Sequence, residues 1–166
     1  MSWSEIRLCW LLLLAVPTLQ LGACGFRLQG AVTYPDFMAT TYIETSDRYT
    51  DFYRGLREAL ERGGVEVVES TVAAGALIRI DEDRTGQKVL TVSGRNVPTE
   101  YDVFYSVSYS VWREGVQVLP MRTLVKRQDY TYDSTLVLGK SREEQELREA
   151  IAAALVQQVS RQLARL

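Results

Sequence analysis

A strict two-residue period between residues 101 and 112 is the strongest constraint on the fold of this chain. Such alternation of apolar and mostly polar residues is typical of a β-strand with one face in the core. The face expected in the core carries Tyr101, Val103, Tyr105, Val107, Tyr109 and Val111. The opposite face carries Asp102, Phe104, Ser106, Ser108, Ser110 and Trp112. These residues predict a long strand covered on one side only.

The residues that follow predict an antiparallel partner for this strand. Arg113-Glu114-Gly115 is typical of a hairpin turn, and the stretch 116–132 returns as a second long strand. Because Pro120 has no backbone N–H, we expect an edge position or a bulge there.

Upstream of the alternating stretch, two shorter segments favour extended structure. Residues 76–81 and 89–92 are predicted to be strands, with a turn at Thr85-Gly86-Gln87 between them. Residues 93–99 contain Gly and Pro and predict a loop.

A first helix is expected within a β-α-β unit. It lies between predicted strands at 40–45 and 65–68, with Ser46 or Asp47 as its N-cap and Gly63-Gly64 at its end. Its length would be about 14–16 residues. Its apolar residues at helical spacing are Phe52, Tyr53, Leu56, Ala59 and Leu60.

A second, long helix is expected at the C-terminus. Ser141 and Glu144 form the capping-box pattern S-x-x-E, which places the predicted start of the helix at Ser141. An apolar stripe follows at Leu147, Ile151, Leu155, Val159 and Leu163. The predicted fold class is therefore α+β, with two helices packed on one face of a four-stranded, mostly antiparallel sheet.

The first 23 residues differ from the rest and predict a signal peptide. The apolar run 8–16 is too short to span a bilayer, which needs about 20 residues. Leu21-Gly22-Ala23-Cys24 resembles the lipobox of bacterial lipoproteins, which implies cleavage before Cys24 and acylation of that residue. An ordinary signal peptide ending near a cysteine is the alternative. We expect a removed segment at 1–23, a lipidated tether at 24–39 and one domain at 40–166.

Composition excludes several functions. The chain has no histidine, so a Ser-His-Asp triad and an imidazole-bound metal are impossible. A net charge of −2 and a pI near 5.3 argue against a nucleic-acid partner. Acidic clusters at 81–83 and 143–146 leave a carboxylate-based hydrolase as a remote alternative. We expect neither catalytic residues nor a cofactor or metal.

Several ordered segments of the chain carry a resemblance to a known family. They are 127–133, Leu138-Gly139-Lys140, Glu143-Glu144 and Leu147-Arg148 near the C-terminus. Further segments, in the same order as in the family, are 24–30, 42–47, Leu56-Arg57 and 64–67. Together these segments resemble the LptE family of lipopolysaccharide-assembly lipoproteins.

This resemblance implies a two-helix, four-stranded plug inside the outer-membrane β-barrel LptD, which helps that barrel assemble and contacts lipopolysaccharide during export. It implies that acylated Cys24 anchors the protein in the cell outer membrane. Lipoproteins retained in the inner membrane typically have Asp after the acylated cysteine, and this chain has Gly25 there, which implies delivery to the outer membrane. Lys140 falls on the family's lipopolysaccharide-contacting loop lysine, and Arg95 lies where the family has a second basic residue. Arg142 adds a nearby cation. A generic lipoprotein scaffold for another envelope protein remains the alternative function.

Overall fold

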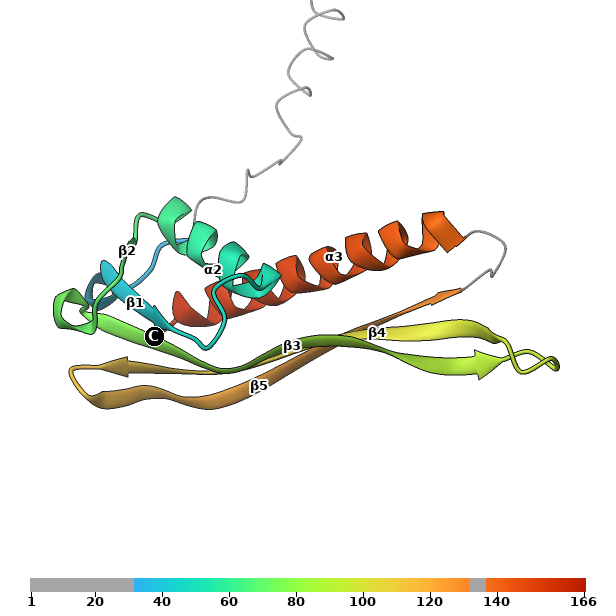
Figure 1. Cartoon of the computed structure of the whole chain (residues 1–166). Coiled ribbons are helices and arrows are strands. Elements are labelled where there is room, and N and C mark those ends of the chain that lie inside the picture. Colours follow the sequence, from blue (N-terminus) through green and yellow to red (C-terminus); the bar gives the residue numbers. More distant parts are fainter. Residues whose placement is uncertain (1–31, 132–136) are drawn as a thin grey trace, which may run out of the picture. The chain divides into compact units, whose positions relative to one another are not determined.

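The computed structural model describes residues 32–131 and 137–166 (Figure 1). These residues form one compact unit with an α+β fold. Its helices are η2 (Asp36–Met38), α2 (Asp51–Arg62), η3 (Thr71–Ala73) and α3 (Val137–Leu163). Its strands are β1 (Thr40–Glu44), β2 (Glu66–Val68), β3 (Ala76–Val92), β4 (Pro98–Arg113) and β5 (Val116–Thr131).

The described strands form one mixed sheet of five strands in the order β2-β1-β3-β4-β5. β1 runs parallel to β2 and β3, whereas β3, β4 and β5 form antiparallel pairs. Helices α2 and α3 lie on the same face of the sheet, as expected (Figure 1). The predicted fold class is confirmed. The short strand β2, next to β1, brings the sheet to five strands where four were expected.

Strand β4, between β3 and the edge strand β5, contributes several of the largest side chains of the core. Tyr105 and Tyr109 are 2% and 1% exposed beneath the helices, which confirms the buried face predicted from the alternation. The serines of the opposite face are also buried, because the longer side chains of β3 and β5 flank them. The apolar stripe of α3 closes the core with Ile151, Leu155, Val159 and Leu163.

Strand β3 runs without interruption where a turn was predicted. Thr85, Gly86 and Gln87 pair with β4 in continuous register, so the expected turn is wrong. Gly86 lies beside the ring of Phe104, and a Cβ added at Gly86 would lie 2.9 Å from Cζ of that ring. The glycine therefore makes room for a cross-strand aromatic side chain.

A bulge at Asp81 changes which side chains of β3 face the helices. Ile80 pairs with Tyr109 and Glu82 with Ser108, so Asp81 has no partner on β4. After the bulge the odd-numbered residues lie on the helix side, from Asp83 opposite Val107 to Val89 opposite Tyr101. The bulge thus puts a carboxylate on the inner face of the sheet.

The first helix starts later than predicted. Its N-cap is Thr50, whose Oγ1 accepts a hydrogen bond from the Tyr53 backbone N–H at 3.1 Å. The Asp47 carboxylate instead accepts from the Tyr49 N–H at 2.8 Å and closes the preceding turn. The expected N-cap at Ser46 or Asp47 is therefore wrong, and α2 has 12 residues.

The predictions for the second hairpin are confirmed. Glu114 and Gly115 form the turn with positive φ angles of 50° and 79°. β5 is an edge strand, and its register with β4 shifts close to Pro120, between the pairs Tyr109–Arg122 and Val111–Leu119. Within the described residues, no helix is long and apolar enough to cross a membrane.

Candidate functional site

The turn between β3 and β4 holds Arg95 at its apex. The Ser93 N–H donates to the Val97 carbonyl at 2.8 Å, and the Asn96 N–H donates to the Ser93 carbonyl at 2.9 Å. Asn96 has φ of 60°, a left-handed conformation that asparagine tolerates better than most residues. The predicted loop is confirmed, and its own hydrogen bonds order it.

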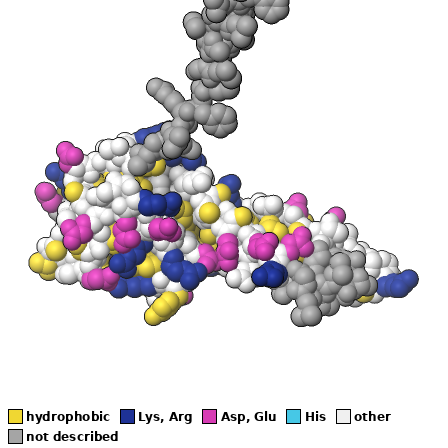
Figure 2. Space-filling model, turned by 90° about the horizontal axis from the view of Figure 1, so that it is seen from above, with side chains coloured by type: hydrophobic (Ala, Val, Ile, Leu, Met, Phe, Trp, Pro, Cys, Tyr) yellow, Lys and Arg dark blue, Asp and Glu magenta, His cyan; other side chains and the backbone are white. Residues whose placement is uncertain are grey.

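Arg95 is exposed, and no ion pair involves it in the part of the chain that the structure describes. Apolar side chains around it are also exposed: Val89, Leu90, Val92 and Val97. Figure 2 shows Lys and Arg side chains at the end of the molecule where this hairpin lies. A cation next to exposed apolar side chains can bind an anionic amphiphile through charge and apolar contact together.

Lys140 does not lie in a loop before the terminal helix. Helix α3 begins at Val137, so Lys140 belongs to its first turn and Ser141 is not the N-cap. The Glu144 carboxylate pairs with Arg148 one turn later, which is an interaction within the helix. The capping-box prediction is therefore wrong. The side chain of Lys140 lies outside the described residues.

The topology brings the beginning of α3 to the same end of the sheet as the β3–β4 turn. Thr131, the last residue of β5, pairs with Glu100 near the start of β4, and α3 starts six residues later. Arg142, on the second turn of α3, is exposed and forms no ion pair with any described residue. Arg95, Lys140 and Arg142 therefore belong to elements that lie toward the same end of the sheet, and the β3–β4 turn extends beyond the start of α3 (Figure 1).

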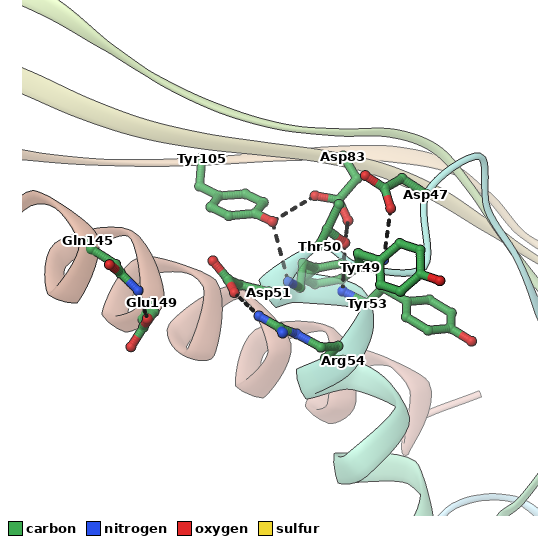
Figure 3. Close-up of polar contacts among 11 residues, drawn as sticks. Asp47, Tyr49, Thr50, Asp51, Tyr53, Arg54, Asp83, Tyr105, Gln145 and Glu149 are labelled. Carbon is green, nitrogen blue, oxygen red and sulfur yellow. Dashed lines mark hydrogen bonds and ion pairs between the residues drawn. The ribbon is translucent and has the colours of Figure 1, made fainter.

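The acidic cluster at 81–83 is divided between the two faces of the sheet. Glu82 pairs with Arg84 at 2.6 Å on the face opposite the helices. Asp83 lies on the helix side, where Thr50 Oγ1 donates to it at 2.5 Å and the Tyr105 hydroxyl donates at 2.8 Å (Figure 3). Burial raises the pKa of Asp83 above its usual value, although the two hydrogen bonds oppose that shift.

These contacts indicate that Asp83 has a structural role. It joins the N-cap of α2 to the central tyrosine of β4, whose hydroxyl also accepts from the Phe52 N–H at 3.3 Å. In the described residues, no group of three potential metal-ligating side chains comes together. The carboxylates of 81–83 therefore do not converge as a hydrolytic site requires.

A surface pocket of about 370 Å³ lies at the other end of β3 and β4. Its floor includes Leu77 and Trp112, and the Arg79 guanidinium lies 5.7 Å from the ring centroid of Trp112. The Arg79 side chain is also paired with Glu44 at 2.7 Å. None of the candidate residues from the sequence lines this pocket.

The predicted lipidation site, Cys24, and the whole predicted signal peptide lie outside the described residues. The first half of the tether, residues 24–31, is likewise outside them. The lipid anchor thus stays a prediction from the sequence.

Comparisons with known proteins converge on one family. The family model described as "LptE: Lipopolysaccharide-assembly" matches residues 38–163. A protein of Yersinia enterocolitica named LPS-assembly lipoprotein LptE is 27% identical over 154 residues, covering 92% of this chain and 74% of that protein. The protein of the same name from Yersinia pestis is 27% identical over 153 residues, covering 92% and 73%.

Solved structures support the fold. Rare lipoprotein B of Shewanella oneidensis superposes with a TM-score of 0.66 at 23% identity, covering 76% of this chain and 94% of that one. Lipoprotein B of Nitrosomonas europaea gives a TM-score of 0.69 at 21% identity, covering 84% and 90%. At these identities, the likeness concerns the fold alone.

Proposed function

Because the chain belongs to the LptE family of lipopolysaccharide-assembly proteins, we propose that it plugs and helps assemble the LptD barrel and binds lipopolysaccharide on its way to the cell surface. As a member of that family it is a non-enzymatic lipoprotein involved in lipopolysaccharide assembly at the outer membrane. The observation that carries the proposal is the family match over 38–163, and the exposed Arg95 at the hairpin apex, which forms no ion pair with a described residue, agrees with it.

The proposed lipopolysaccharide site consists of Arg95, Lys140 and Arg142. Lipopolysaccharide carries phosphates and carboxylates, to which arginine and lysine form charge-assisted hydrogen bonds. Lys140 is in the first turn of α3, where unpaired backbone N–H groups favour an anion. The exposed Val92 and Val97 next to Arg95 would contact the apolar part of the same lipid.

The proposed anchor is Cys24. A lipid on Cys24 would hold residues 40–166 at the outer membrane as one domain, with 24–39 as its tether and 1–23 removed. More than one acyl chain gives stable anchoring at about 0.8 kcal/mol for each buried methylene.

A charge-reversal experiment tests the lipid site. The double variant Arg95→Asp/Lys140→Asp should bind purified lipopolysaccharide at least tenfold more weakly at low salt, because anion contacts become repulsions. Arg161→Asp/Arg165→Asp is the matched control, since it makes the same change in net charge at the C-terminal end of α3. Both variants should still co-purify with the barrel. Equal affinity of the two variants would refute the assignment of the site.

A further inference from the structure

Strand β5 leaves one long edge of the sheet open within the described residues. The irregular part of the strand is confined to its beginning, where Pro120 and the register shifts lie. From Arg122 to Thr131 the ladder with β4 is unbroken, from the pair Tyr109–Arg122 to the pair Glu100–Thr131. An edge strand of this kind presents backbone N–H and C=O groups to another chain.

The side chains of this edge differ between its two faces. Arg122 and Lys126 lie on the helix side, opposite Tyr109 and Tyr105 of β4. Thr123 and Val125 lie on the other side, opposite serines, and Val125 is 49% exposed. A strand added here would meet Arg122 and Lys126 on one of its faces and Thr123 and the exposed Val125 on the other.

The edge is also basic in a chain whose net charge is −2. Between positions 121 and 129 there are three cations, Arg122, Lys126 and Arg127, against Asp129. Arg127 is already paired with Asp102 at 2.7 Å. Arg122 and Lys126 are exposed, and neither forms an ion pair with any described residue.

These charges distinguish between the kinds of molecule that could bind the β5 edge. A second copy of the same edge, paired antiparallel, would bring cations close to cations, which is unfavourable across a strand pair. A lipid headgroup would use the cations but leave the backbone edge and Val125 without a role. An acidic extended polypeptide uses all three features.

We propose that the β5 edge from Arg122 to Asp129 receives an acidic extended segment of the barrel partner as an added strand. The inference rests on the proposed function, because it takes the barrel as the source of that segment. Backbone hydrogen bonds would supply affinity, and carboxylates facing Arg122 and Lys126 would set the register. This contact surface is distinct from the proposed lipid site at Arg95 and Lys140.

The first test measures how much barrel is retained by the full-length chain. The chain is co-expressed with the barrel and purified through a tag in detergent at low salt. Arg122→Glu/Lys126→Glu should retain at least tenfold less barrel than the unaltered chain. The control Arg161→Glu/Arg165→Glu, with the same change in net charge, should retain it. Circular dichroism must show the same melting temperature for Arg122→Glu/Lys126→Glu as for the unaltered chain.

The second test maps the geometry in cells. A photo-crosslinking residue is placed in turn at positions 123, 125 and 127, which share one face of β5. Strand addition predicts crosslinks to a single acidic segment of the barrel, advancing by two residues at each step. Crosslinks scattered over several segments would contradict strand addition.

The outcomes separate the two proposals. If the unaltered chain holds no barrel, the proposed function fails and the inference fails with it. If Arg122→Glu/Lys126→Glu retains as much barrel as the control, the inference alone fails. If that variant keeps the barrel but loses lipopolysaccharide binding, the edge is a lipid site and strand addition is refuted.

Discussion

The Tyr105 hydroxyl donates a hydrogen bond of 2.8 Å to Asp83, across the β3–β4 ladder and beneath the N-terminus of α2. The same hydroxyl accepts from the Phe52 N–H, and Thr50 donates to the other oxygen of the carboxylate. Figure 3 shows how these groups lie around the first turn of the helix. Two strands and one helix therefore share one polar junction.

Removing the Tyr105 hydroxyl should destabilise the fold. Tyr105→Phe leaves a half-buried carboxylate with one donor fewer, at a cost of about 1–3 kcal/mol in the free energy of unfolding. Urea denaturation monitored by circular dichroism measures this cost. Tyr49→Phe is the control, because that side chain is 86% exposed. A Tyr105→Phe protein as stable as Tyr49→Phe would show that the junction contributes nothing.

The same junction predicts a pH dependence. Burial raises the pKa of Asp83 in the folded chain above 3.8, the ordinary value of an aspartate carboxyl group. The folded state therefore binds the proton more tightly than the unfolded state, so this contribution to stability is complete below pH 3.8. It is lost as the pH rises through the raised folded-state pKa.

The comparison with Asp83→Asn isolates this contribution. The measured quantity is the free energy of unfolding of the unaltered chain minus that of the variant. This difference should decrease as the pH is raised from 4 toward neutrality, whatever constant offset the substitution introduces. Urea denaturation at several pH values gives this difference. A difference that rises with pH would mean that the pKa of Asp83 is lowered.

The end of α2 should not accept a side chain at Gly63. A Cβ there would lie 2.3 Å from Tyr34 Cε2 and 2.7 Å from the Val32 carbonyl oxygen, and the backbone atom cannot move aside easily. Gly63→Ala should lower the free energy of unfolding by about 1–3 kcal/mol. At Gly94 nothing lies within 4 Å of an added Cβ, so Gly94→Ala is the matched control. Equal thermal stability of the two variants would contradict the close contact.

Loss of the lipid anchor should release the protein. Cys24→Ala should move the chain from the membrane fraction to the soluble fraction after cell lysis, because the acyl chains are gone. Cys9→Ala is the control, since it alters a cysteine within the predicted signal peptide. Fractionation with immunoblotting reads the result. Membrane association of Cys24→Ala would mean that the lipid is dispensable for attachment.

Local pattern predicted the regular elements well and their ends less well. The alternation at 101–112, the turn at Glu114-Gly115 and the edge position of Pro120 depend on neighbouring residues, and all three are confirmed. The start of α2 depends on Thr50, whose oxygen also contacts Asp83, 33 positions away in the sequence. Such a contact leaves no trace in a local pattern.

Two further predictions differ from the structure. The turn predicted around Gly86 is wrong, and that glycine lies beside Phe104 of the neighbouring strand, again a contact between distant parts of the sequence. The helix start predicted at Ser141 is also wrong, since α3 begins four residues earlier, at Val137. For the candidate site, the loop around Arg95 is confirmed, whereas the roles of Arg95, Lys140 and Arg142 in lipid binding stay predictions.

The bulge at Asp81 is a position where the length of this protein can change by a single residue. Removing Asp81 would leave Glu82 opposite Ser108 and Asp83 opposite Val107, so the ladder would become regular and Asp83 would stay on the helix side. Between Glu82 and Val89 the situation differs, because one residue added to or removed from β3 alone would turn the following side chains to the opposite face. In that stretch, changes of length should therefore be tolerated in twos, whereas a change of one residue should be tolerated only at the bulge.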